Sequence, residues 1–280
     1  MAKRKYIWDE KKIARCLKEG RGEGRRESYK PWLTIHDLSS LGRSTRAHSF
    51  KTGREHHLLS DLETGLFFLL EWDEAVVDIR EQFPLDREAT RRLAQDAGIA
   101  HPKDPSTQTD IVMTSDALVD VKTPDGIRKV VCAVKPASKL DDRRVIEKLE
   151  LERRYWRAQG TPWYLVTDRD LPVERVKNIR WLHEMYSLDH QMIPHPAYWD
   201  DRCERFVQQL SRTQGGLIRD FFQRLEESCG FAPGDALTVL RHLAARRIVL
   251  IDLDRSFSTN DNLECLALSS AATESVRRVA

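Results

Sequence analysis

The stretch DALVDVKTPDGIRKVVCAVK, residues 116–135, decides the fold of this chain. It contains two strand-like apolar runs, DALVDV and VVCAVK, on either side of the sequence KTPDG. Because Pro and Gly in that order favour a tight turn, we predict a β-hairpin over these residues. Asp116 begins the first predicted strand, and Lys135 ends the second.

A second acid, Glu63, lies near the start of an apolar segment that we predict to be a helix beginning at Ser60. At about 100° per residue, Glu63 falls within the apolar arc of Leu66, Phe67 and Leu70. A carboxylate that is turned inward needs a partner, and a metal ion would be one. Ser60 and Glu63 also form a capping box, in which Glu63 bonds back to the start of its own helix. Both interpretations stay open from the sequence.

Glu63, Asp116 and Lys135 together suit the metal-assisted cleavage of a phosphodiester. Carboxylates bind a hard cation through oxygen. The cation generates hydroxide and stabilises charge on the scissile phosphate. The lysine would orient or deprotonate the attacking water, or bind the phosphate.

The spacing of these residues is typical of restriction-endonuclease-like enzymes, in which an Asp is followed about twenty residues later by acid-x-Lys. The pattern here is incomplete, because Ala133 stands where the second acid would be and Ser115, not Pro, precedes Asp116. The alternative interpretation is that Lys135 merely extends its ammonium to solvent at a strand end.

Length and composition narrow the class of protein. A chain of 280 residues is long enough to form two domains, which we predict over residues 1–170 and 171–280. The formal net charge of +2 argues against a globally basic protein that coats DNA, although residues 1–30 hold eleven Lys or Arg against five acids. Five scattered cysteines without a CxxC pair indicate reduced thiols and argue against a zinc site. Without a signal segment or membrane span, we expect a cytoplasmic protein that associates with the nucleoid when active.

The remaining pattern of residues 1–170 alternates strands and helices, which predicts an α/β layer architecture. Residues 1–30 indicate an amphipathic helix followed by a glycine-rich stretch, which can stay mobile and become ordered on DNA or on a partner. We predict a basic hairpin or loop within 45–59 and a helix over 143–160. On that helix Glu152 lies on the apolar stripe, where it would either form a salt bridge at the edge of the stripe or take part in the site.

From about residue 170 the pattern changes to helices, which we predict over 173–188, 202–212, 215–228 and 233–246. Two strand-like runs follow, within 248–253 and 263–268, so that this part is winged-helix-like. The helix over 236–243 has few basic residues on its outer face, which favours docking of a protein over readout of DNA.

Several blocks occur in one order that resembles a known family, the TnsA endonuclease subunits of heteromeric TnsA–TnsB transposases. The resemblance covers nearly all of residues 1–170 and is weaker beyond them. The blocks that carry it are KEGRG (18–22), YKPWLT (29–34), HHLLSDLE (56–63), DIREQFPL (78–85), VKPA (134–137) and EKLELERRYW (147–156).

The resemblance implies a restriction-endonuclease-like catalytic domain followed by a C-terminal winged-helix-like domain. Glu63, Asp116 and Lys135 match the catalytic residues of the family. The resemblance also implies Mg²⁺, with Mn²⁺ as a substitute, bound by Glu63, Asp116 and the backbone carbonyl of Val134. Glu152 matches a position near a second metal ion.

A member of this family would cut the 5′ strands at transposon ends. The implied partners are transposon-end DNA, a TnsB-type transposase subunit and a TnsC-type regulatory ATPase. Ala133 departs from the family pattern, in which this side chain is often polar or acidic. Two rival hypotheses are a non-catalytic adaptor with a degraded nuclease fold, and a stand-alone restriction-type nuclease. An intact set of Glu63, Asp116 and Lys135 disfavours the adaptor.

Overall fold

The computed structural model describes residues 7–37 and 43–279, the last five of them as backbone only. The chain divides into two compact units at the junction between Leu171 and Pro172, and each unit is described by itself. The basic residues 3–5 lie outside the described residues.

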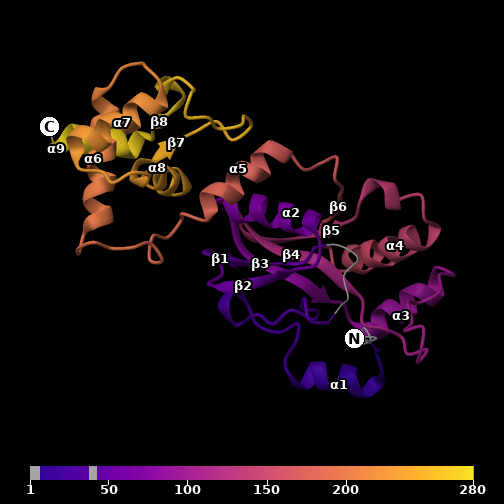
Figure 1. Cartoon of the computed structure of the whole chain (residues 1–280). Coiled ribbons are helices and arrows are strands. Elements are labelled where there is room, and N and C mark those ends of the chain that lie inside the picture. The colour runs from indigo at the N-terminus through magenta and orange to yellow at the C-terminus, as the bar shows by residue number, and fades with distance from the viewer. Residues whose placement is uncertain (1–6, 38–42, 280) are drawn as a thin grey trace. The chain divides into compact units, whose positions relative to one another are not determined.

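The N-terminal unit is built on a four-stranded sheet with the order β3-β4-β5-β6 (Figure 1). Its strands are β3 (Val76–Pro84), β4 (Thr114–Thr123), β5 (Gly126–Val134) and β6 (Trp163–Val166). The first three are antiparallel neighbours, and β6 runs parallel to β5. Strands β4 and β5 pair from Ala117 opposite Cys132 to Thr123 opposite Gly126, which confirms the hairpin predicted over 116–135.

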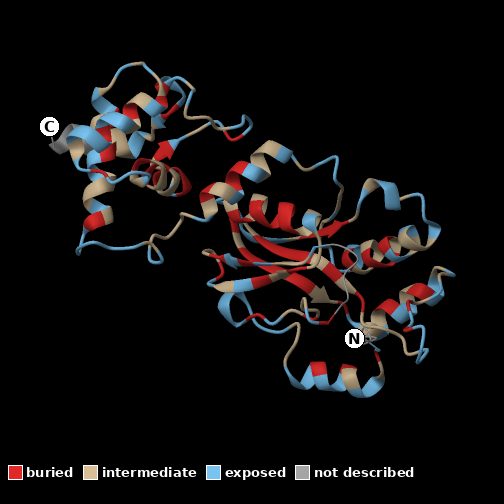
Figure 2. Cartoon of the chain, in the orientation of Figure 1, coloured by how far each residue is buried: buried red, intermediate tan, exposed pale blue. Residues whose placement is uncertain are grey.

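Helices cover this sheet on two sides. On one side, Leu66 and Phe67 of α2 (Asp61–Trp72) line a small cavity with Ile79 and Ala117 of the sheet. On the other side, α3 (Arg87–Asp96) and α4 (Arg143–Ala158) pack against the sheet in a core cluster. The buried members of that cluster are Leu85, Ala94, Met113, Leu118, Val131, Leu151 and Trp156. Buried residues run along the central strands and the inner side of α2 (Figure 2). This mixed α/β arrangement confirms the predicted class and fits a nuclease fold.

The segment after α1 (Glu10–Lys18), which the sequence allows to stay mobile, is packed against β3 in this structure. Gly22 N donates to the Lys30 carbonyl at 2.6 Å, and Trp32 N donates to the Gln82 carbonyl of β3 at 3.2 Å. Gly22 has φ +87°, and a Cβ at this position would lie 2.2 Å from Pro84 Cγ. The glycine therefore lets the Pro84 ring pack directly against the backbone of residue 22, where any side chain would collide with the ring.

Two further features complete the N-terminal unit. Strands β1 (Thr45–Ser49) and β2 (Arg54–Leu58) form an antiparallel hairpin, which confirms the hairpin predicted within 45–59. Short 3₁₀ turns occupy Arg26–Ser28 and Ala137–Lys139.

The C-terminal unit is mainly helical. Its elements are α5 (Val173–His183), α6 (Tyr198–Arg212), α7 (Ile218–Cys229), α8 (Asp235–Ala245), β7 (Val249–Leu250), a 3₁₀ turn (Leu263–Cys265), β8 (Ala267–Leu268) and α9 (Ser270–Val279). Its core includes Phe206, Ile218, Phe221, Val239 and Leu240, each at most 1% exposed. Helices followed by a short antiparallel pair agree with the predicted order of elements, and the winged-helix assignment stays a prediction.

Several predicted bounds in this unit are wrong. The helix expected over 173–188 ends at His183, where tight turns replace it: Met185 N donates to the Leu182 carbonyl at 2.9 Å and Tyr186 N to the His183 carbonyl at 3.1 Å. Helix α6 begins at Tyr198 rather than at 202. Helix α7 begins at Ile218 rather than at 215, because Gly215 and Gly216 both have positive φ. The strand expected over 248–253 shortens to β7, and that expected over 263–268 to β8.

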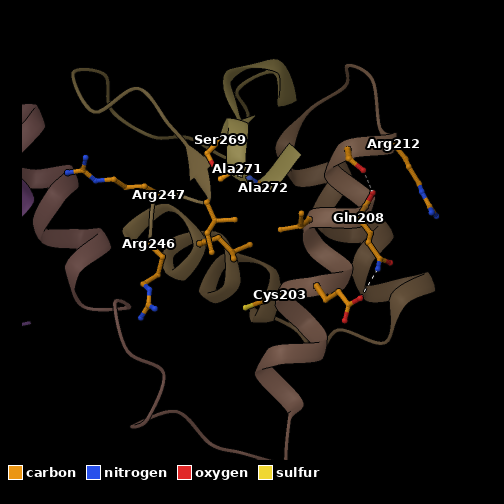
Figure 3. A pocket seen from close by; sticks show the side chains of 13 residues that line it. Cys203, Gln208, Arg212, Arg246, Arg247, Ser269, Ala271 and Ala272 are labelled. Carbon is orange, nitrogen blue, oxygen red and sulfur yellow. Dashed lines mark hydrogen bonds between the residues drawn. The ribbon is translucent and has the colours of Figure 1, made fainter. Parts of the chain in front are cut away.

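A groove of about 710 Å³ opens in the C-terminal unit (Figure 3). Side chains of α6, of the end of α8 and of the start of α9 line it, among them Cys203, Gln208, Arg212, Arg246 and Ser269. Within residues 7–37 and 43–279, no helix is both long enough and apolar enough to cross a membrane.

Candidate active site

The fold brings Asp116 and Lys135 into contact at one end of the β4–β5 hairpin. The Lys135 ammonium donates to Asp116 Oδ2 at 3.1 Å and to the Val134 carbonyl at 2.7 Å. Val134 N also donates to Asp116 Oδ2, at 2.7 Å. Asp116 is therefore held by the neighbouring strand, and its carboxylate faces the end of β5.

The contacts of Lys135 show that this place accommodates positive charge. The negative charge of Asp116 raises the pKa of Lys135 above its usual value, so the side chain stays an ammonium at neutral pH. A carboxylate oxygen and a backbone carbonyl converge on that cation. The same two kinds of oxygen are the ligands that Mg²⁺ and Ca²⁺ prefer.

Glu63 approaches the site from the start of α2. Its carboxylate accepts hydrogen bonds from Leu59 N at 3.0 Å and from the Ser60 hydroxyl at 2.9 Å, and Glu63 N donates back to Ser60 Oγ at 3.2 Å. Glu63 therefore bonds back to the start of its own helix as predicted, although the backbone donor is Leu59 N and not the N–H of the cap residue Ser60. The inward orientation is also correct, since Glu63 lines one cavity with Leu66 and Asp116. One side chain thus begins the helix and faces the second acid.

Gln82 of β3 joins the two acids. Its amide Nε2 donates to Glu63 Oε2 at 3.2 Å and reaches Asp116 Oδ1 at 3.5 Å. The sequence reasoning missed this residue, because a glutamine in a predicted strand carries no sign of its direction.

Glu152 of α4 is buried, with 6% of its surface exposed, as its place on the apolar stripe predicts. The salt bridge considered for it does not form within the described part of the chain, whereas Glu147 and Glu150 of the same helix both pair with arginines. Its Oε1 atom has no hydrogen-bond partner among the described residues. Hydrogen bonding from Ser115 and Trp163 acts to lower the pKa of this carboxyl, so the cost of its burial is offset in part.

Burial and the nearby Asp116 charge raise the pKa of Glu63 to about 7 and that of Glu152 to about 7. Both acids therefore lose their protons near neutral pH, well above the usual range of glutamates. Both acids feel the charge of Asp116, and carboxylates whose pKa values are shifted by burial and by a neighbouring acid are concentrated at functional sites.

The donor set fits a hard divalent cation. Glu63, Asp116, Glu152 and the Val134 carbonyl all offer oxygen, which is the ligand type of Mg²⁺. Ala133 is completely buried and offers no side-chain ligand. Within the described residues, no group of three or more His, Cys, Asp or Glu side chains is arranged to hold a metal ion. A cation here would therefore depend on the backbone carbonyl as well as on the acids.

The raised pKa of Glu152 predicts a pH-dependent stability of the protein in a chelator. An acid whose pKa is raised on folding contributes stability that is full below the unfolded value of about 4.5 and is lost as pH rises to about 7. Because of Glu152, the free energy of unfolding of the wild type should fall by an amount on the order of 3 kcal/mol between these pH values, and we expect Glu152→Gln to abolish this fall. Denaturant melts in EDTA at pH 5 and pH 7.5 measure it.

The matched control is Glu150→Gln on the same helix. Hydrogen bonds from Arg153 lower the pKa of Glu150 to about 2, so this acid does not titrate in the range tested. Its variant should keep the wild-type pH dependence. An equal pH dependence in the wild type and in Glu152→Gln would contradict the assigned pKa.

Comparison with known proteins identifies the family of this chain. Residues 73–168 match the family model described as TnsA-like endonuclease N terminal, and residues 170–253 match that described as TnsA endonuclease C terminal. The Transposon Tn7 transposition protein TnsA of Escherichia coli is 39% identical over 281 residues, which covers 100% of both chains. The two family models follow one another along the chain, and the relative matches it from end to end. The chain therefore belongs to the TnsA family and is a DNA endonuclease subunit of a Tn7-type transposase.

Proposed function

We propose that this subunit cuts the 5′, non-transferred strands at transposon ends, using Mg²⁺ held by Glu63 and Asp116. The observation that carries the proposal is that Glu63, Asp116 and Lys135 come together at the end of the β4–β5 hairpin. Lys135 contacts Asp116 directly, and the Gln82 amide links Asp116 to Glu63. The relative's printed name describes a transposition protein, which supports transposon ends as the substrate.

The acids of this chain would act as metal ligands, together with the Val134 carbonyl. Bound Mg²⁺ would supply a hydroxide nucleophile at neutral pH and stabilise charge on the scissile phosphate. Glu152 would bind a second ion or orient Lys135, because its negative charge contributes to raising the pKa of that lysine. Mn²⁺, which takes the same oxygen ligands, should substitute for Mg²⁺.

Lys135 would act on the attacking water or on the scissile phosphate. Its ammonium is held protonated by Asp116, so it serves better as a hydrogen-bond donor and a fixed positive charge than as a base in this arrangement. A fixed charge placed where negative charge develops lowers the barrier without reorganisation.

The non-catalytic adaptor is the rival function. Burying Glu152 with an unpaired oxygen destabilises the fold, and an adaptor would gain nothing from it. A chain that had lost catalysis would be free to replace this acid by an apolar residue. The retained acids and the contact between Lys135 and Asp116 therefore favour the nuclease.

We further propose that a TnsB-type transposase and a TnsC-type ATPase are the partners, and that the C-terminal unit is a winged-helix-like docking module. Support comes from the near-neutral charge of the chain and from the helical core followed by the β7–β8 pair. A net charge of +2 gives weak affinity for DNA, because affinity for the duplex grows with the number of neutralised phosphates.

The isolated subunit is therefore expected to be nearly inactive and to need the transposase in order to cut. The test is nicking of labelled transposon-end DNA with and without the partner, in Mg²⁺ and in EDTA. We expect 5′-strand cuts only when partner and Mg²⁺ are both present. Efficient, sequence-specific double-strand breaks by the subunit alone would favour the restriction-type rival.

A further inference from the structure

Gln82 has a backbone conformation that its residue type avoids. Its φ is +47°, although it lies inside β3 and only 2% of its surface is exposed. For a residue other than glycine, a left-handed conformation costs roughly 1 kcal/mol or more. Such a conformation persists only where the surrounding structure holds it, and it is most common at functional sites.

The surroundings hold Gln82 through contacts from two segments. Trp32 N donates to the Gln82 carbonyl at 3.2 Å, and the Tyr29 hydroxyl donates to the adjacent Glu81 carbonyl at 3.0 Å. On the side chain, the Thr114 hydroxyl donates to Gln82 Oε1 at 3.0 Å. The N-terminal segment therefore fixes the backbone, and Thr114 fixes the amide.

The direction of the amide follows from these contacts. With Oε1 accepting from Thr114, the two hydrogens of Nε2 point toward Glu63 Oε2 at 3.2 Å and Asp116 Oδ1 at 3.5 Å. The opposite orientation would place the amide oxygen against two carboxylates, where it would be repelled. Each acid keeps its other oxygen for different partners, Ser60 for Glu63 and Lys135 for Asp116.

We propose that Gln82 is a positioning residue, whose amide holds Glu63 and Asp116 at the spacing that a divalent cation needs. This inference rests on the proposed function of the two acids. A neutral donor between two carboxylates offsets their repulsion without competing for the cation, because an amide nitrogen does not ligate a hard metal. Residues that hydrogen-bond metal ligands typically change metal affinity or activity by about 10–100-fold when they are replaced.

Two substitutions distinguish the effect of the Gln82 amide from that of its backbone conformation. Gln82→Met keeps the length of the side chain without a donor, and Gln82→Gly accepts a positive φ at no steric cost. The amide is what both variants lack. We expect Mg²⁺ affinity, measured by calorimetry on the full-length protein, to fall about 10–100-fold in both, with a comparable loss of 5′-strand cleavage beside the transposase.

A third variant keeps the inference testable if those two fold poorly. Thr114→Val leaves Gln82 in place and removes the hydroxyl that orients its amide. We expect a smaller loss of Mg²⁺ affinity, with a circular dichroism spectrum and melting temperature close to those of the wild type. Unchanged Mg²⁺ affinity in this variant would count against the inference.

Unchanged Mg²⁺ affinity in folded Gln82→Met would overturn the inference. A loss in Gln82→Met but not in Gln82→Gly would overturn it too, since the backbone conformation would then be the cause. Alanine variants of Glu63 and Asp116 tell this failure from that of the proposed function. If both of them cut normally, the site itself is wrongly placed, whereas if they are inactive and the Gln82 variants are not, only the positioning role fails.

Discussion

Asp116→Ala should lose 5′-strand cleavage almost completely, by about a thousandfold or more, which corresponds to about 4 kcal/mol of transition-state stabilisation. Asp116 is the residue on which the site converges, because Lys135, Val134 N and the Gln82 amide all contact its carboxylate. Ala133 offers no replacement carboxylate on the neighbouring strand. The measurement is single-turnover cleavage of end-labelled transposon-end DNA by the complex with the transposase.

The control for Asp116→Ala is Asp125→Ala, which removes an exposed acid from the turn of the same hairpin. This variant should cut like the wild type. Both variants should fold and bind the partner, as judged by circular dichroism and co-purification. Near-normal cleavage by folded Asp116→Ala would refute the assignment of this residue as the central metal ligand.

The parts of the site that depend on local sequence patterns were predictable. The hairpin over 116–135 follows from two apolar runs and one turn, and it puts Asp116 beside Lys135 without any knowledge of the rest of the chain. The inward direction of Glu63 follows from helical periodicity. Such local patterns predict the structure because the fixed periods of a strand and of a helix set the direction of each side chain.

The role of Gln82 was not predictable, because its cause lies far away in the sequence. Its left-handed backbone is held by Trp32, and its amide by Thr114. A strand pattern predicts extended backbone at every position and gives no sign of the exception. The same reason applies to residues 20–30, where three glycines permit mobility but Gly22 instead allows contact with Pro84.

Glu152 lies between these cases. Its spacing from Leu149 and Trp156 predicts its burial, and the structure confirms it. Whether a buried glutamate finds a salt bridge depends on the elements that pack against it, which periodicity does not identify. The helices of the C-terminal unit show the same limit, since the apolar pattern found α5 to α8 but capping and tight turns set their ends.

Lys135→Ala should also lose 5′-strand cleavage, by about a thousandfold, while it still binds Mg²⁺. The two effects separate because the lysine carries the same sign of charge as the metal ion. Its ammonium now contacts Asp116 Oδ2 and the Val134 carbonyl, both of which we propose as ligands. Removal of the ammonium frees these oxygens, so Mg²⁺ affinity should stay the same or rise.

Calorimetry with Mg²⁺ and single-turnover cleavage, measured on the same preparation, distinguish the possible roles of Lys135. Lys139→Ala removes an exposed lysine four residues further along the chain and should change neither quantity. If Lys135→Ala lost metal binding together with cleavage, the lysine would hold the two ligands in place rather than act on the water or phosphate. Retained binding without cleavage is the expected result, because a positive charge that serves the transition state contributes nothing to holding the cation.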